Sequence, residues 1–270
     1  MTILVTGNLG YIGPVITDIL NEKNIDFIGY DVGYFENCLL QNSLNTFPQI
    51  KKDIRDLDNN DLKNISDIVH LSALSNDPLG EFNSKITRDI NFNATMSLAT
   101  LAKKRGIKRF VYISSQSMYG ISNTSIELEE YNSEKNPVTE YAKTKWQAEQ
   151  ELNKLSDKNF SVVSLRPSTV FGVSPRLRCD IVFNNLLASA FTTGKIEIKS
   201  DGSPWRPVVH VKDVCSAILA ALNAPIDLVE GKAFNIGIEN GNYTVKELAE
   251  VVNRTVKGSK LKFTNEHLKD

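Results

Sequence analysis

The stretch T-I-L-V-T-G-N-L-G-Y-I-G, residues 2–13, decides the fold of this chain. Its first residues are apolar and β-branched and predict a β-strand, whereas Tyr11–Asn21 has the pattern of a helix. Between the two, Gly7, Gly10 and Gly13 recur at intervals of three. Glycines at this spacing allow a tight turn and a close approach of backbone to a pyrophosphate, and the helix N-terminus adds free N–H groups. The stretch therefore predicts a dinucleotide site, with contacts from Gly7, Asn8, Leu9, Gly10, Tyr11, Ile12 and Gly13.

A carboxylate follows the second predicted strand, Asp26–Tyr30. Asp31 lies 18 residues after Gly13, where a carboxylate accepts hydrogen bonds from the adenosine ribose and repels a 2′-phosphate. No arginine directly follows Asp31, so the sequence favours NAD(H) over NADP(H). Asp53 and Ile54 follow a predicted third strand and are expected at the adenine edge, although Asp53 equally fits an ordinary turn.

Strands and helices alternate over the first two thirds of the chain. Further strands are predicted at Ile65–Leu71, Arg109–Ser114 and Phe160–Leu165, with helices at Ile86–Lys104 and Glu140–Leu155 between them. Such alternation, with apolar strands, predicts an α/β fold with a doubly wound parallel sheet that is covered by helices on both faces.

The pattern loosens after Arg166-Pro167. The later elements are helices near Ile181–Ala190, Lys212–Leu222 and Val245–Val256, and strands at Ala233–Ile236 and Lys260–Phe263. Thr244, with Glu247 three residues on, predicts a capping box for the last helix. We expect a nucleotide-binding domain over 1–166 and a smaller lobe over 167–270, with some of its segments returning to the first domain.

Composition narrows the class of protein. Of the 270 residues 41% are hydrophobic and 23% charged, and the net charge is −1. This balance gives no sign of a nucleic-acid or membrane partner. The chain starts directly with a strand and has no apolar run of membrane-spanning length, so we expect no signal peptide and a cytoplasmic protein. Three cysteines and three histidines are scattered (Cys38, Cys179, Cys215, His70, His210 and His267), which argues against a metal site.

Tyr141 and Lys145 stand in the run E-Y-A-K-T-K, residues 140–145. A spacing of four puts both side chains on one face of a helix. A neighbouring ammonium stabilises the phenolate and lowers a pKa that starts near 10, so that Tyr141 can act as a base near neutral pH. The alternative is an exposed pair on a helix surface, and the glycine turn upstream favours the catalytic interpretation.

Several more segments accompany these motifs. They are Leu71-Ser72-Ala73 after His70, Asp89–Thr95 around Asn91, Ser114–Gly120, Arg166-Pro167, Val170-Phe171-Gly172, and Gly202 with Arg206 and His210–Asp213. In these segments the chain resembles the extended short-chain dehydrogenase/reductase family, and within it the NAD-dependent sugar epimerases and dehydratases. The resemblance implies a Rossmann-type sheet with a smaller C-terminal α/β substrate lobe.

The resemblance also assigns roles. It makes Ser115, which lies 26 residues before Tyr141, the hydroxyl that orients the reacting sugar hydroxyl. Tyr141 becomes the base, and Lys145 holds the nicotinamide ribose. The remaining residues expected to contact the cofactor are Leu71, Ser72, Ala73, Asn91, Ser114 and Pro167.

The two residues after Ser115 depart from part of this family. Members that eliminate water carry an Asp-Glu pair there, whereas this chain has Gln116 and Ser117, which cannot serve as acid and base at neutral pH. The departure argues against a 4,6-dehydratase and disfavours a decarboxylase. A C4 epimerase, a dehydrogenase and a ketoreductase remain open, as does a non-catalytic dinucleotide sensor, which would have no need of Ser115, Tyr141 and Lys145.

The resemblance implies a nucleotide-diphosphate sugar as substrate. Arg206 and Asn185 match residues that bind the diphosphate, and Gln116 is expected near the sugar. Arg176, like Arg178, either reaches a phosphate or a carboxylate or is simply solvated. The resemblance further implies a homodimer through the helices at Ile86–Lys104 and Glu140–Leu155. Family members usually run longer, which implies a compact or C-terminally shortened variant.

Overall fold

The computed structural model describes residues 2–40, 46–75, 77–121 and 127–264. The chain divides into two compact units. The first unit comprises Met1–Pro167, Ser174–Arg176 and Lys212–Ile236, and the second comprises Ser168–Val173, Leu177–Val211 and Gly237–Asp270. The segment Lys212–Ile236 thus belongs to the first unit although it lies late in the sequence.

A seven-stranded sheet forms the centre of the first unit, in the order β10-β6-β5-β4-β1-β2-β3. Every neighbouring pair is parallel. The strands are β1 (Ile3–Thr6), β2 (Phe27–Asp31), β3 (Gln49–Lys51), β4 (Asp67–His70), β5 (Arg109–Ile113), β6 (Ser161–Pro167) and β10 (Lys232–Ile236). The strand order turns back at β1 and β4, which is the pattern of a doubly wound sheet, and the predicted fold class is confirmed.

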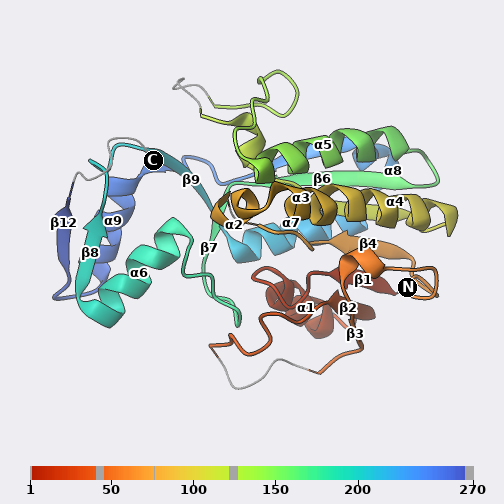
Figure 1. Ribbon diagram of the computed structural model, residues 1–270, viewed down its shortest axis with the longest axis horizontal. Helices are drawn as coiled ribbons and strands as arrows, with labels where there is room; N and C mark the ends of the chain where they lie inside the picture. Colours follow the sequence, from red (N-terminus) through yellow and green to blue (C-terminus); the bar gives the residue numbers. More distant parts are fainter. Residues whose placement is uncertain (1, 41–45, 76, 122–126, 265–270) are drawn as a thin grey trace. The chain divides into compact units, whose positions relative to one another are not determined.

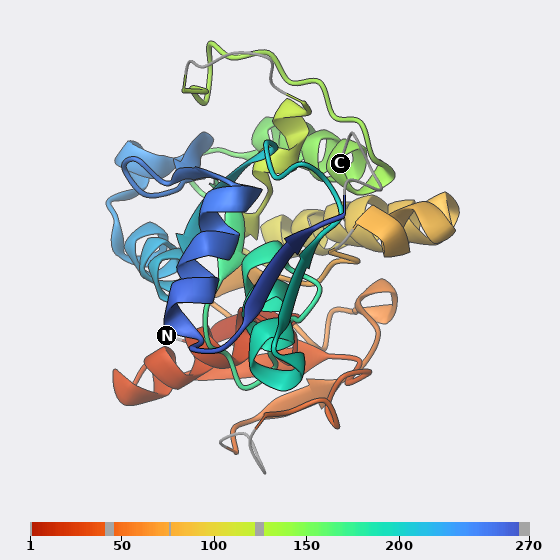
Figure 2. The same cartoon turned by 90° about the vertical axis from the view of Figure 1, so that its left-hand side faces the viewer.

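Helices cover both faces of this sheet. α1 (Gly13–Glu22) and α7 (Val211–Asn223) lie on one face, and α4 (Thr95–Lys104) and α5 (Glu140–Leu155) lie on the other (Figures 1 and 2). Apolar residues of β1, β4, β5 and β6 pack with Leu98 of α4 and Leu152 of α5 in one buried cluster. The shorter helices are α2 (Asp77–Phe82), α3 (Ser84–Arg88) and α8 (Ile226–Val229).

The predicted helix Ile86–Lys104 is a composite. α3 passes into a π-helical turn at Asp89–Ala94, and α4 follows without a break. A π-turn contains an extra residue and rotates the side chains that follow, and such turns occur often at functional sites. Asn91 lies inside this turn.

The second unit contains two small sheets and two longer helices. β7 (Thr169–Phe171), β9 (Trp205–His210) and β11 (Asn242–Thr244) form one sheet, and β8 (Lys195–Ile198) pairs with β12 (Lys260–Phe263) in the other. α6 (Val182–Thr193) and α9 (Val245–Thr255) pack on one core that includes Leu186, Ile196 and Leu248. α9 begins with the expected capping box between Thr244 and Glu247.

Two further observations concern the part of the chain that the structure describes. None of its helices is both long enough and apolar enough to cross a membrane. It also contains no group of three or more His, Cys, Asp or Glu residues that could hold a metal ion, while His267 lies outside the described residues.

Candidate functional site

The glycine turn packs tightly against the end of β4. Gly7 has a positive φ of 73°, and a Cβ atom there would lie 2.6 Å from the backbone nitrogen of Ser72. A Cβ atom on Gly13 would lie 2.2 Å from the carbonyl oxygen of Asn8. The Gly10 N–H donates to the Gly7 carbonyl at 3.1 Å and closes the turn. Gly7 and Gly13 therefore have no room for a side chain, and the backbone at the start of α1 stays uncovered.

The N-terminus of α1 carries no side-chain cap at Ile12. The first N–H groups of a helix have no partner within the helix, so this end can accept an anionic group. Asn8 is fully buried, and its side chain donates from Nδ2 to Gln49 Oε1 at 2.8 Å, so a cofactor contact from Asn8 remains a prediction. The Tyr11 carbonyl accepts a hydrogen bond from Ser174 Oγ at 2.7 Å.

Asp31 ends β2 beside the glycine turn. Its Oδ2 accepts a hydrogen bond from the Leu9 N–H at 3.2 Å, and its Oδ1 accepts one from the Gly33 N–H at 2.8 Å. Burial raises the pKa of the carboxyl, and the two backbone donors counteract that rise. These bonds fix the carboxylate next to the turn, where it can accept hydrogen bonds from the ribose of a dinucleotide.

Asp53 caps a short 3-10 turn, Ile54–Asp56, and is bound by Arg55. The two carboxylate oxygens accept from Arg55 Nε at 3.0 Å and Nη2 at 2.7 Å, and this pair lowers the pKa of Asp53. Ile54 is buried below the turn. The ordinary turn role anticipated as an alternative is thus present, and an adenine contact from Asp53 remains a prediction.

The segment after β4 is held by Thr6 and Asn91. The Leu71 N–H donates to the Thr6 carbonyl at 3.0 Å, and the Ser72 N–H reaches Thr6 Oγ1 at 3.4 Å. Asn91 is buried, accepts from the Leu74 N–H at 2.8 Å and donates to the Leu74 carbonyl at 3.0 Å. Asn91 therefore fixes the backbone that follows half-buried Ala73, which is a supporting role.

His70, which precedes this segment, is buried between two threonines. Its ring nitrogens lie 2.7 Å from Thr6 Oγ1 and 2.8 Å from Thr95 Oγ1. Burial lowers the pKa of His70 to about 3, so the ring is neutral at physiological pH. The ring joins β1, β4 and α4, and both of its nitrogens are engaged in these hydrogen bonds.

Ser115 stands just past the end of β5 and caps the 3-10 turn Gln116–Tyr119. Its Oγ accepts a hydrogen bond from the Ser117 N–H at 3.1 Å and donates to Ser117 Oγ at 3.0 Å. The buried Ser114 hydroxyl has no hydrogen-bond partner among the described residues. Half-buried Gln116 begins the turn.

α5 carries Tyr141 and Lys145 one turn apart. Thr139 caps the helix by accepting a hydrogen bond from the Ala142 N–H at 3.2 Å. Lys145 is 3% exposed, and its Nζ donates to the Ile113 carbonyl at 2.7 Å. Burial lowers the pKa of Lys145 to about 7. Because Ile113 is two residues before Ser115, this bond brings the helix face of Tyr141 to the strand end that bears Ser115.

The residues predicted to bind substrate are divided between the units. Arg176 lies in the first unit, with its guanidinium 4.2 Å from the centroid of the Phe35 ring. Asn185 and Arg206 lie in the second unit. The exposed Asn185 donates to the Cys179 carbonyl at 2.9 Å, and Arg206 donates to the Trp205 carbonyl at 3.0 Å. Arg178 pairs with Asp180 in the same unit.

Comparison of the sequence with those of known proteins identifies the family of this chain. A sequence model of the NAD-dependent epimerase/dehydratase family matches residues 3–237. The chain belongs to this family. The match spans the glycine turn, both catalytic candidates on α5 and the last strand of the central sheet, and the resemblance inferred from the sequence motifs is confirmed.

Individual members of the family are similar over most of their length. A putative UDP-glucose 4-epimerase of Methanocaldococcus jannaschii is 30% identical over 267 residues, which cover 94% of this chain and 82% of the relative. The UDP-glucose 4-epimerase of Bacillus subtilis is 27% identical, with 93% and 80% covered. The solved structure of MoeE5 in complex with UDP-glucuronic acid and NAD has a TM-score of 0.85 at 25% identity, covering 100% of this chain and 87% of that chain.

NAD, the cofactor of the family, fits the residues described above. The turn at Gly7 and Gly13 has no room for a Cβ atom, α1 is uncapped, and the Asp31 carboxylate is fixed beside them. Pro167 ends β6, where it pairs in register with Ile236 of β10. The predicted cofactor is confirmed by the family, and the contacts of the individual residues with NAD remain predictions.

Sequence reasoning did not anticipate several supporting residues. Gln49 binds Asn8, and Asn184 links the Gly172 N–H with the Arg178 carbonyl. Glu149 pairs with Arg166 inside the first unit. Only Glu149 had a signal in the sequence, because it follows Lys145 by four residues and so shares its helix face.

Proposed function

We propose that this chain is an NAD-dependent enzyme that oxidises or epimerises a nucleotide-activated sugar at C4. The observation that carries the proposal is the bond from Lys145 Nζ to the Ile113 carbonyl. It holds the buried Lys145 amino group one helical turn from Tyr141 and beside the strand end of Ser115. A sensor that only binds a dinucleotide would not require this arrangement.

Tyr141 is the base in this proposal. When the nearby Lys145 is protonated it stabilises the Tyr141 phenolate, which takes the proton from the C4 hydroxyl. Ser115 Oγ hydrogen-bonds the same hydroxyl, and the Ser117 N–H holds Ser115 Oγ in position. The C–O bond gains carbonyl character as the hydride leaves C4 with its electron pair.

NAD supplies the hydride acceptor when it is bound. The glycine turn and the N-terminus of α1 would bind its pyrophosphate, and Asp31 would bind the adenosine ribose. In an epimerase NAD would supply the hydride acceptor and the donor in turn, so that C4 could change configuration with no net redox change. Tyr141 then gives its proton back to the C4 oxygen.

The turn after Ser115 argues against elimination chemistry. Removal of water beside a 4-keto group needs an acid and a base next to the sugar. In this chain those positions hold Gln116 and Ser117, and the Ser117 hydroxyl accepts from Ser115 Oγ. We therefore favour reversible oxidation and reduction at a single carbon.

The diphosphate of the substrate would bind Arg206 and Asn185. A guanidinium has a planar fork of donors that suits phosphate oxygens. Two of the similar proteins are named as UDP-glucose 4-epimerases, one of them putatively, which supports a UDP-sugar as the first substrate to test. A homodimer through α4 and α5 belongs to the same proposal and is tested by analytical ultracentrifugation.

The test begins with cofactor released from denatured protein and identified by mass. Nucleotide sugars carrying UDP, GDP or dTDP are then added while absorbance at the reduced-nicotinamide band and the sugar NMR spectrum are followed. A change of configuration at C4 without net absorbance change supports an epimerase. A steady fall of added NADH would mean a ketoreductase, and the absence of turnover with every sugar would refute the proposal.

A further inference from the structure

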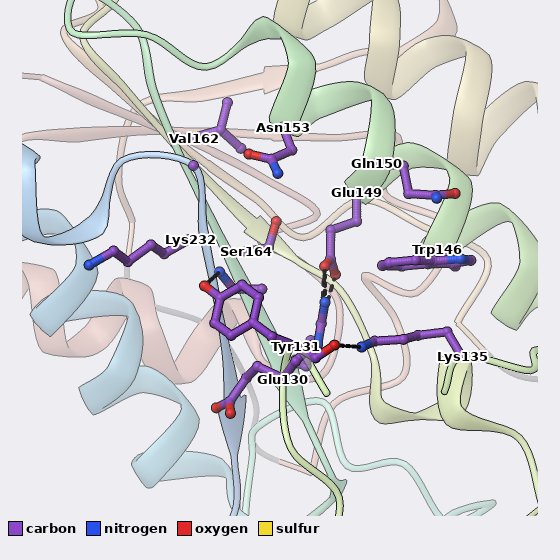
Figure 3. A pocket seen from close by; sticks show the side chains of 13 residues that line it. Glu130, Tyr131, Lys135, Trp146, Glu149, Gln150, Asn153, Val162, Ser164 and Lys232 are labelled. Carbon is purple, nitrogen blue, oxygen red and sulfur yellow. Dashed lines mark hydrogen bonds and ion pairs between the residues drawn. The ribbon is translucent and has the colours of Figure 1, made fainter. Parts of the chain in front are cut away.

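A cavity of about 210 Å³ lies beside α5, β6 and β10 in the first unit. Its lining includes Trp146 and Glu149 of α5, Arg166 of β6, and Tyr131 and Lys135 of the segment before α5. In Figure 3 the Glu149 carboxylate is joined by dashed lines to its ion-pair partner, with Trp146 and Tyr131 seen on either side. The lining includes neither Ser115 nor Tyr141, so the cavity is separate from the reacting groups.

A buried ion pair forms the inner wall of this cavity. The side chains of Arg166 and Glu149 are only 4% and 6% exposed. Arg166 Nε donates to the Glu149 carboxylate oxygens at 3.0 and 3.2 Å. A buried carboxylate without a partner is costly, so the position of Glu149 depends on this guanidinium.

Arg166 has two more acceptors, on other segments. Its Nη1 donates to the Tyr119 hydroxyl at 2.8 Å and to the Glu130 carbonyl at 2.9 Å. Tyr119 itself donates to Asn235 Oδ1 of β10 at 2.8 Å. One guanidinium therefore joins α5, the turn after β5, the segment before α5 and, through Tyr119, β10.

Two of these partners lie on the elements that carry the proposed catalytic groups. Glu149 lies four residues after Lys145 and eight after Tyr141, on the same face of α5. Tyr119 ends the 3-10 turn that Ser115 caps. Arg166 is thus bonded to both elements whose separation sets the distance between the Ser115 hydroxyl and the Tyr141 phenol.

We propose that Arg166 is a positioning residue that aligns Ser115 with Tyr141 by bonding Tyr119 and Glu149 at once. This inference rests on the proposed function of Ser115 and Tyr141. A planar fork with donors in fixed directions is required, because a lysine offers one point charge and cannot reach three acceptors in this geometry.

The test compares Arg166→Lys and Arg166→Ala with Tyr119→Phe, which removes a single acceptor of the guanidinium. Arg105→Ala is the matched control, because Arg105 is exposed and donates to the Asn59 carbonyl outside this junction. For each variant we would measure kcat and KM below the unfolding temperature and the Kd of NAD. A crystal structure of each variant would give the distance from Ser115 Oγ to Tyr141 Oη.

Arg166→Lys is expected to lower kcat about tenfold or more and Tyr119→Phe about threefold, with KM and the Kd of NAD unchanged. In the Lys variant the Ser115–Tyr141 distance should differ from wild type. Millimolar guanidinium should restore part of kcat to Arg166→Ala, because the ion can enter the enlarged cavity, and should restore nothing to Arg166→Lys.

A purely structural Arg166 would give a different result. The unfolding temperature would fall while kcat and the Ser115–Tyr141 distance stayed at wild-type values, and this would overturn the proposal. If the wild-type protein turns over no nucleotide sugar, the proposed function fails. The positioning role is then tested only by the Ser115–Tyr141 distance in crystals of the wild type and the Arg166 variants. A changed Ser115–Tyr141 distance in the Arg166 variants then supports the positioning role, and an unchanged distance overturns it.

Discussion

The reacting groups and the proposed diphosphate groups are held in different ways. Lys145 is buried, and its bond to Ile113 reaches 32 positions back along the chain. Arg206 of the second unit donates to the carbonyl of the residue directly before it, and Asn185 binds a carbonyl six positions away. The first kind of contact fixes the position of a group through the core, and the second fixes only the local backbone. If the proposed roles hold, chemistry depends on packing in the first unit, while affinity for the diphosphate depends on local segments of the second.

The strongest test of this contrast is Tyr141→Phe. It should lower kcat by about a hundredfold or more while the Kd of NAD stays the same, because only proton transfer is lost. Tyr131→Phe is the matched control, since Tyr131 is an exposed residue whose hydroxyl, within the part of the chain that the structure describes, only accepts a 3.4 Å bond from the Ala233 N–H. Steady-state kinetics and equilibrium dialysis measure the two quantities, and a Tyr141→Phe enzyme of normal rate would assign the base elsewhere.

Burial of Lys145 should also appear as a pH dependence of stability. Its folded pKa of about 7 lies below the unfolded value of about 10.4, so the unfolded chain binds more protons between these limits and stability rises with pH. Relative to Lys145→Met, the unfolding free energy of the NAD-free wild type should increase by about 2 kcal/mol from pH 7 to pH 9. Urea unfolding of both proteins at each pH provides the values, and parallel pH curves would show that burial does not depress this pKa.

Asp31→Asn tests the cofactor side of the first unit. The substitution keeps the shape and removes the charge that binds ribose hydroxyls and repels a 2′-phosphate, so the Kd of NAD should rise about tenfold. The preference for NAD over NADP should shrink as well. Asp26→Asn, at an exposed position just before β2, serves as the control in calorimetric titrations with both nucleotides. An unchanged preference would remove Asp31 from the ribose site.

Arg206→Ala is expected to act on substrate binding alone. The KM for the nucleotide sugar should rise about tenfold with kcat within twofold of wild type, because a charged hydrogen bond to phosphate is lost. Arg254→Ala on α9 is the control, an exposed arginine of the same unit. A large drop in kcat instead would mean that the second unit also aligns the reacting carbon, which would contradict the contrast drawn here.

The sequence by itself determined the doubly wound sheet, the glycine turn and the bounds of α5, because each of these is set by local spacing. Gly7, Gly10 and Gly13 follow a strand and open a helix, and Glu140–Leu155 has the helical period throughout. The same spacing put Tyr141 and Lys145 on one face. The π-turn around Asn91 was not predicted, since a single extra residue in a helical pattern changes the period very little.

Only the tertiary structure decided what these side chains contact. Asn8 turns its amide to Gln49, Asp53 is bound by Arg55, and Asn91 binds the Leu74 backbone. Lys145 reaches Ile113, and Arg166 joins three segments that are far apart in the sequence. A hydrogen bond is specified by the meeting of two groups in space, and local pattern carries no information about which distant segment completes it. The sequence therefore named the candidates for chemistry, and the packing of β5, β6 and α5 determined how they are held.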